Sequence, residues 1–353
     1  MDDLQESDGG DGWVCGGVHL SHSMRECTLR WLRYAGAVLS MCAMMPALAQ
    51  PADWPARPIT IVSPYSPGGS DVAIRLYTNW INARNPKWIF VIDFKPGAQG
   101  ALAYGPVAKA PADGYTLAQT SSTLLLTEVM ETRPPYSIGQ FSPVFRLYGT
   151  PQVLMAHASV PAKSLPEFVA YAKANPGKLD WAMIGMAGIQ RLTAEFVQDL
   201  LGVKFTFVPY KGTSTIGPAV ISGEVHATLQ SPRNTQAMIK TGKVRALAHT
   251  GRPGFSFPQV PDIRSFAESG GPAFEHVSWS GLHAPAGTPL AIRTAMNRAF
   301  NEPFNDPGFE KAFLNTGDVP ERNSIEDFEK FLTSQKDRWV NTANRLGLKL
   351  TGD

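Results

Sequence analysis

Cysteine is nearly absent from this chain, and its absence limits the chemistry that the protein can perform. The sequence has 353 residues and three cysteines, Cys15, Cys27 and Cys42, all within the first 49 residues. The rest of the chain therefore has no disulfide, no thiolate nucleophile and no cysteine metal site. Its stability has to come from hydrophobic cores, and a chain of this length is large enough to form two of them.

The usual catalytic signatures are missing as well. The sequence contains no HExxH zinc motif, no GxSxG nucleophile turn and no phosphate-binding loop ending in Gly-Lys-Ser/Thr. No two histidines after residue 50 are three or four positions apart, which argues against a metal site on one helix face. We therefore predict that the protein is not an enzyme and needs no cofactor or metal. An exported enzyme on the same scaffold is kept as the less favoured alternative.

Charge and long apolar runs are also scarce. Charged residues make up 18% of the sequence and the net charge is +2, so there is no basic surface of the kind that binds nucleic acid. The longest apolar stretch, residues 34–45, is shorter than the roughly 18 residues needed to span a bilayer. We therefore predict no nucleic-acid partner and no transmembrane helix.

Residues 1–49 resemble an export signal. A basic segment, 24–33, precedes the apolar stretch 34–45, and Ala47-Leu48-Ala49 forms a small-x-small cleavage site before Gln50. Residues 1–23 are acidic, which is unusual for the start of a signal peptide and favours translation from Met24. We predict cleavage after Ala49 and a periplasmic location. A cytoplasmic protein with a disordered tail and a lipoprotein attached through Cys42 are the alternatives.

Residues 59–71 are the centre of the predicted architecture. The β-branched run 59–63 ends at a turn rich in proline and glycine (64–69), and a helical pattern begins at about residue 71. Such a turn leaves free backbone N–H groups at a helix start, where the helix dipole favours an anion. One hypothesis is therefore a site for a carboxylate. The other is an ordinary turn in which Ser70 or Asp71 caps the helix.

The same strand, glycine loop and helix pattern returns about 120 residues later. The apolar run 181–184 leads into the glycine loop 185–190, and Arg191 stands at the start of the next helix. Polar residues 120–123 also follow a predicted strand, where they fit either a ligand crevice or a helix cap. Strands and helices alternate along the whole chain, which predicts an α/β fold with short connections between parallel strands. Two glycine-loop units predict two lobes with a ligand cleft between them.

Six motifs follow one another along the chain: IVSPYSPGGSD (61–71), KPGAQG (95–100), DGYTL (113–117), VPYKG (208–212), GKVRALA (242–248) and APAGTP (284–289). In this order they resemble the motifs of the Bug family, the extracytoplasmic solute receptors of tripartite tricarboxylate transporters. The resemblance extends from about residue 54 to the C-terminus. It implies a two-lobed periplasmic-binding fold (type II-like), with 50–150 plus 280–353 as lobe 1 and 151–279 as lobe 2. It also implies hinge closure on a small di- or tricarboxylic, amino or aromatic acid.

The sequence departs from the family pattern at the loops that the resemblance assigns to the ligand. Only Ser70 separates the glycine pair from Asp71, where the family usually has two residues. The family often has Ser-x-His where this chain has 189–191, and often Asp at the position of Gln230. Gaining Arg191 and losing an acid would make the cleft more positive, and Arg191 could hold a carboxylate through two hydrogen bonds. Together with the apolar residue 189, these changes suggest an aromatic or alkyl carboxylate.

These considerations define the predicted ligand site and the predicted partners. A membrane transporter that the receptor docks against is the expected protein partner, and the receptor itself is expected to be a monomer. An accessory receptor for a membrane sensor kinase is an alternative that the sequence does not separate. The predicted ligand-binding residues are Tyr65, Ser66, Pro67, Gly68, Gly69, Ser70, Asp71, Ser121, Ser122, Gly185, Gly188, Gln190, Arg191, Tyr210, Lys211 and Gln230.

Overall fold

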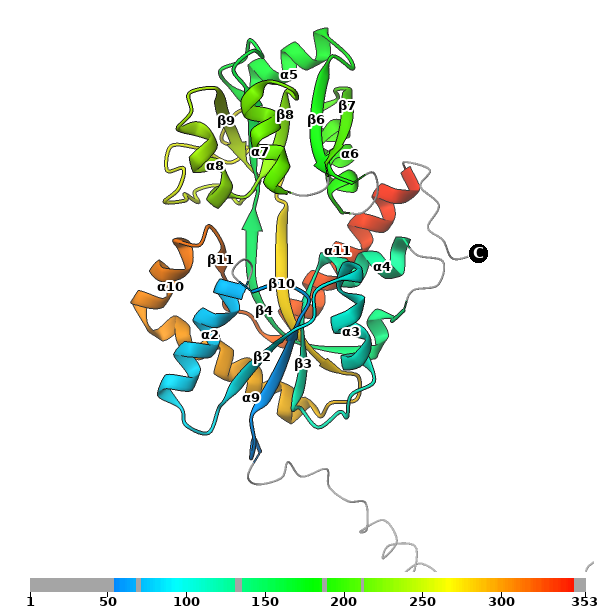
Figure 1. The fold of residues 1–353 in the computed structure, drawn as a ribbon, viewed down its shortest axis with the longest axis vertical. Coiled ribbons are helices and arrows are strands. Elements are labelled where there is room, and N and C mark those ends of the chain that lie inside the picture. Colours follow the sequence, from blue (N-terminus) through cyan, green and yellow to red (C-terminus); the bar gives the residue numbers. More distant parts are fainter. Residues whose placement is uncertain (1–53, 68–70, 131–134, 186–188, 211–212, 346–353) are drawn as a thin grey trace, which may run out of the picture. The chain divides into compact units, whose positions relative to one another are not determined.

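The computed structural model describes residues 54–67, 71–130, 135–185, 189–210 and 213–345 (Figure 1). The predicted export segment lies outside the described residues, and so does the strand-like pattern at 346–350. Within the described ranges the strands form two separate sheets, each covered by helices.

The first sheet has six strands in the order β11-β4-β10-β3-β1-β2. The strands are β1 (Ile59–Ser63), β2 (Phe90–Phe94), β3 (Thr116–Ser121), β4 (Phe141–Pro151), β10 (Val277–Pro285) and β11 (Val319–Pro320). β1 runs parallel to both β2 and β3, whereas β10 is antiparallel to β3 and β4, and β11 is antiparallel to β4. The expectation of parallel units is therefore wrong for three of the five strand pairings of this sheet. β10 re-enters it from the other direction, after the chain has built the second sheet.

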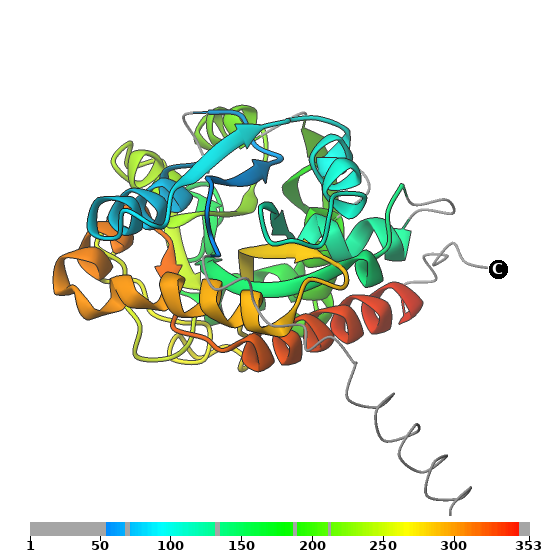
Figure 2. The same ribbon diagram turned by 90° about the horizontal axis from the view of Figure 1, so that it is seen from below.

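Alternating side chains of the first sheet serve two different cores, because successive residues of a strand point to opposite faces. Ile61 and Leu117 join a core with α2 (Asp71–Arg84), α9 (Leu290–Asn301) and α10 (Pro307–Leu314). The next residues, Val62 and Ala118, face α3 (Ala101–Ala108) and α4 (Ser122–Met130) instead. Figure 2 shows α9 and α3 on the two sides of this sheet. The long helix α11 (Ile325–Arg345) packs through Phe328 against Trp279 of β10.

The second sheet has five strands in the order β7-β6-β8-β5-β9. β6 runs parallel to β7 and β8, whereas β5 is antiparallel to β8 and β9. The helices α5 and α6 share a core with one face, and α7 and α8 share a core with the other. The strands are β5 (Val153–His157), β6 (Leu179–Ile184), β7 (Phe205–Tyr210), β8 (Ala227–Gln230) and β9 (Val244–His249). The helices are α5 (Leu165–Ala174), α6 (Ile189–Leu201), α7 (Thr213–Ser222) and α8 (Pro232–Ile239).

Local signals in the sequence set several of these element boundaries. Ser164 caps α5, since its side chain accepts a hydrogen bond from the Glu167 backbone N–H at 3.4 Å, as the Ser-x-x-Glu pattern predicts. The remaining short helices are η1 (Ala98–Gly100), η2 (Ile138–Gln140) and η3 (Glu302–Asn305). Both glycine-loop units have the predicted strand before the loop and the predicted helix after it.

Candidate functional site

The predicted ligand loops follow the carboxyl ends of parallel strands in both sheets. In the first sheet, β1 and β3 end at Ser63 and Ser121. In the second sheet, β6, β7 and β8 end at Ile184, Tyr210 and Gln230. Ligands of open α/β sheets bind in the crevice outside such strand ends, next to the helix starts that follow them. In Figure 1, these ends of the two sheets are turned toward each other.

A cluster of hydroxyl groups lies at the carboxyl end of β3. We call Tyr65, Tyr104, Ser121 and Thr123 the hydroxyl cluster. The Thr123 hydroxyl lies 2.9 Å from the Ser121 hydroxyl and 3.3 Å from the Tyr104 hydroxyl, and the Ser121 side chain also lies near Tyr65. Burial raises the pKa of Tyr65 and of Tyr104 above their ordinary values. Both phenols therefore stay protonated at neutral pH, as a donor to an anion must.

The strand pairing places two further polar side chains beside this cluster. Ser280 of β10 is directly opposite Ser121 in the antiparallel ladder, and Gln119 donates to its hydroxyl at 3.3 Å. Tyr148 of β4 is the partner of Ser280 in the antiparallel register of β4 and β10, and burial raises the pKa of Tyr148 well above the ordinary value. The side-chain oxygen of Gln119, Oε1, is buried and has no hydrogen-bond partner within the described part of the chain. Polar groups of Gln119, Tyr148 and Ser280 thus extend from the hydroxyl cluster into the sheet.

The remaining predicted residues of the first sheet differ in their exposure. Ser66 and Pro67 are exposed in the loop after β1, whereas Ser122 is buried at the start of α4. Asp71 is 3% exposed and accepts a hydrogen bond from Arg75 Nε at 2.8 Å on its own helix. It is the first residue of α2, and its charge lies where the dipole of the helix favours an acid.

Two predicted glutamines near the strand ends of the second sheet form hydrogen bonds with residues close to them in the sequence. Gln190 accepts a hydrogen bond from the Ile184 backbone N–H at 2.8 Å, which closes the turn that begins at Gly185. Gln230 is 4% exposed, and its amide contacts Thr228 and Asn234 at 3.4 Å each. Both side chains help to shape the loops at the sheet edge.

Arg191 and Tyr210 have partners within the second sheet and its helices. The Arg191 guanidinium is paired with Glu195 one turn along α6 and lies 4.3 Å from the centre of the Phe207 ring. The Tyr210 hydroxyl donates to Glu224 at 2.6 Å, and burial raises the pKa of Tyr210 to about 12, with Glu224 adding to the shift. The ligand role of both residues remains a prediction. Gly68, Gly69, Ser70, Gly188 and Lys211 lie outside the described residues.

Of two cavities in the described region, one borders the predicted site and the other is lined by different residues. One of about 70 Å³ lies beside Gln190 and is also lined by Gln152, Thr193 and Ser278, which is too small for most ligands but large enough for water. Another of about 730 Å³ is lined by Arg146, Glu321, Arg338 and other residues, none of which is a predicted site residue. The described residues contain no group of three His, Cys, Asp or Glu side chains placed to hold a metal ion.

Comparison with known proteins identifies the family. A family model described as "Tripartite tricarboxylate transporter family receptor" matches residues 87–348. This chain belongs to that receptor family. Protein BugT of Bordetella pertussis is 30% identical over 305 residues, which cover 84% of this chain and 91% of BugT. The predicted membership in the Bug family is thereby confirmed.

Solved structures agree with this assignment. MatC from Rhodopseudomonas palustris, with bound malate, is 28% identical with a TM-score of 0.65, covering 82% of this chain and 99% of MatC. A second R. palustris protein, solved with adipate, is 28% identical with a TM-score of 0.69, covering 83% and 98% of the two chains. The periplasmic binding protein BugD is 26% identical with a TM-score of 0.66 over 84% of this chain and 99% of BugD. The predicted α/β periplasmic-binding-protein fold is confirmed.

The Bug-family receptor therefore has the fold and the class of function that its loop motifs predict. None of its helices within the described ranges combines the length and the apolar character needed to cross a bilayer. Sequence reasoning missed Tyr104, Tyr148 and Ser280, which complete the polar surroundings of Ser121. A serine or tyrosine within an apolar strand was the only signal for the last two, and it does not say which face or neighbour the side chain meets.

Proposed function

We propose that this receptor captures a small carboxylate outside the cytoplasm and delivers it to a tripartite tricarboxylate transporter. The observation that carries the proposal is the hydroxyl cluster at the carboxyl end of β3, next to the start of α4. Protonated phenols, serine hydroxyls and free N–H groups at helix starts are all hydrogen-bond donors, and both oxygens of a carboxylate are acceptors.

The relatives with bound ligands support this ligand class. The two R. palustris structures hold malate and adipate, both of which are dicarboxylates. We therefore place dicarboxylates first in this chain, ahead of the amino, aromatic and tricarboxylic acids. Arg191, Gln190 and the loops after β1 and β6 are the proposed contacts.

We propose further that the two sheets are the cores of two lobes. Lobe 1 would hold residues 50–150 and 280–353, and lobe 2 would hold residues 151–279. The strands of the first sheet come from 59–151 and 277–320, and those of the second come from 153–249, which agrees with these limits except at residues 151 and 277–279, where β4 and β10 extend past them. The proposed export signal, with cleavage after Ala49, would place a monomeric receptor in the periplasm, where it docks on the membrane subunits.

A thermal-shift screen of the chain from Gln50 onward tests the ligand class. The panel contains malate, adipate, citrate, glutamate and benzoate, each beside its amide. A ligand at 100 times its dissociation constant stabilises a protein by about 2.7 kcal/mol, which raises the melting temperature measurably. We expect at least one acid to stabilise the protein and its amide to have no effect. Equal shifts with acid and amide, or no shift with any acid, would refute a carboxylate receptor.

A further inference from the structure

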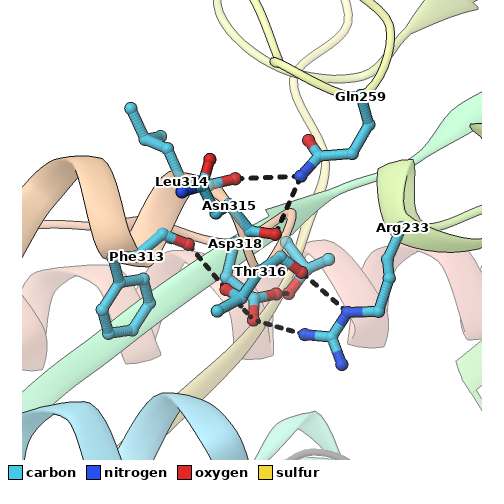
Figure 3. Close-up of polar contacts among 8 residues, drawn as sticks. Arg233, Gln259, Phe313, Leu314, Asn315, Thr316 and Asp318 are labelled. Atoms are coloured by element: carbon cyan, nitrogen blue, oxygen red, sulfur yellow. Dashed lines mark hydrogen bonds and ion pairs between the residues drawn. The ribbon is translucent and has the colours of Figure 1, made fainter.

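One cluster of contacts joins the two proposed lobes (Figure 3). Arg233, at the start of α8, donates from Nε to the Thr316 carbonyl oxygen at 2.8 Å, and its Nη2 lies 3.5 Å from Asp318 Oδ2. Gln259 donates from Nε2 to the carbonyl oxygens of Leu314 and Asn315 at 3.1 Å each. The loop between α10 and β11, residues 315–318, thus receives three donors from the opposite lobe.

Asp318 is the buried acid of this cluster. It is 7% exposed, and its two oxygens accept from the Thr150 hydroxyl at 2.5 Å and the Thr316 hydroxyl at 3.0 Å. These two hydroxyl contacts are shorter than the 3.5 Å to Arg233. Charge-assisted N–H···O contacts are usually about 2.7–2.9 Å, so Arg233 is held only loosely by the carboxylate.

Arg233 has donors that these contacts do not use. Its side chain is 44% exposed, and a guanidinium carries five N–H groups. In Figure 3 the second terminal nitrogen of Arg233 points away from both contacts. Gly317 has a φ of +79° and lies against the Arg233 backbone: an added Cβ would come within 3.1 Å of the Arg233 amide nitrogen.

Arg233 and Asp318 lie within electrostatic range of the hydroxyl cluster and of Tyr148. Burial is the main cause of the raised pKa of Tyr65 and of Tyr148, and the charge of Asp318 adds to both. The positive charge of Arg233 acts in the opposite direction on Tyr148. Arg233 also follows the carboxyl end of β8 by three residues, at the sheet edge where the ligand loops lie.

We propose that Arg233 is a second arginine, in addition to Arg191, that recognises the charge of the ligand, and that Asp318 reduces the effective charge of Arg233 by sharing its guanidinium. The proposal rests on the proposed function, because it assigns a specificity-determining residue to the same cleft. A dicarboxylate bound near the hydroxyl cluster would take the unused N–H groups of Arg233. Asp318 would then limit how strongly the site prefers a charged acid to an uncharged analogue. Its negative charge repels a bound anion, and its contact with Arg233 reduces the positive charge that the anion meets.

Arg191 differs from Arg233 in how its charge is compensated. Glu195, the partner of Arg191, is on the same helix, and the Arg191 side chain is 25% exposed and rests on an aromatic ring. The carboxylate that faces Arg233 comes from the other lobe and is satisfied by two hydroxyls. Arg233 is therefore the arginine whose contacts depend on how the lobes meet.

Isothermal calorimetry with two charge variants tests the proposal. The probes are adipate and malate beside their diamides, replaced by any other acid that the thermal-shift panel identifies. Arg233→Gln should weaken acid binding by about 10- to 100-fold, the loss expected for charged hydrogen bonds, and the diamide should give no binding signal with either protein. Asp318→Asn should instead strengthen acid binding several-fold. Arg252→Gln is the matched control, because Arg252 is an exposed arginine of the same lobe outside this cluster, and it should leave the acid affinity unchanged.

The opposite signs separate charge recognition from a purely structural contact. If the pair only held the lobes together, both variants would lose affinity for the acid. That result, or unchanged acid binding by Arg233→Gln, would overturn the proposal while the wild-type protein still bound acids. Failure of the wild type to bind any acid would instead show that the proposed function is wrong, and the role of Arg233 would fall with it.

Discussion

Gly281 lies at the most crowded point of β10, and replacing it with alanine tests the packing around the site. A methyl group there would overlap Phe328 Cζ, come to 3.0 Å from Phe328 Cε1 and to 3.2 Å from the Phe145 carbonyl oxygen. Phe328 is fully buried and packs edge-on against Trp279. Neither the ring nor the carbonyl is the free end of a flexible side chain, so the strand has to move.

The size of the effect follows from two opposing contributions. Overpacking a filled core usually costs about 1–3 kcal/mol. Alanine recovers about 0.4–1 kcal/mol by restricting the unfolded chain, since the φ of Gly281 is not in the left-handed region. We therefore expect Gly281→Ala to lower the free energy of unfolding by about 1–2 kcal/mol. Ser280 precedes this residue and faces Ser121, so the strain would also reach the hydroxyl cluster.

Urea denaturation of the chain from Gln50 onward measures this change. Gly105→Ala is the control, because an added Cβ in this helix would meet no atom within 4 Å, and it should stabilise the protein by about 0.5–1 kcal/mol. Phe328→Leu should relieve the overlap, so that the double variant loses less than the sum of the two single changes. A Gly281→Ala protein as stable as wild type, or strictly additive losses, would refute the packing argument.

Two further changes test the site and the buried histidines. Arg191→Ala should weaken acid binding by about 1.5–3 kcal/mol, measured by calorimetry; unchanged affinity with a lower melting temperature would assign Arg191 to its ion pair with Glu195 alone. Burial lowers the pKa of His276 and of His283 to about 3, so each stays neutral when folded but becomes protonated when unfolded below pH 6.5. Their contribution to stability is complete above pH 6.5 and is lost as the pH falls toward 3, at about 1.36 kcal/mol per pH unit for each. His276→Phe should remove one of these two protonation sites, so that the free energy of unfolding falls less between pH 6 and pH 4.5 than in the wild type. Denaturation curves that show the same fall as in the wild type would contradict this.

The amino-acid sequence by itself determined the parts of this protein that depend on neighbouring residues. The cap at Ser164, the loops after β1 and β6 and the start of α6 all follow from turn chemistry and helix signals within a few positions. Ser121 could be placed at a strand end for the same reason. Each family motif is likewise a short run of neighbouring residues, so the class of receptor was readable without a structure.

Only the tertiary structure decided which distant residues meet around those loops. β10 inserts between β3 and β4 in the antiparallel direction, and this pairing brings Ser280 to Ser121 across some 160 positions. Arg233 and Asp318 meet because the α10–β11 loop returns to the edge of α8. Hydrophobic periodicity identifies a strand but not its partner or direction, since each face is equally apolar until the sheet is assembled. The charge that we propose to face the ligand is therefore a property of the assembled chain.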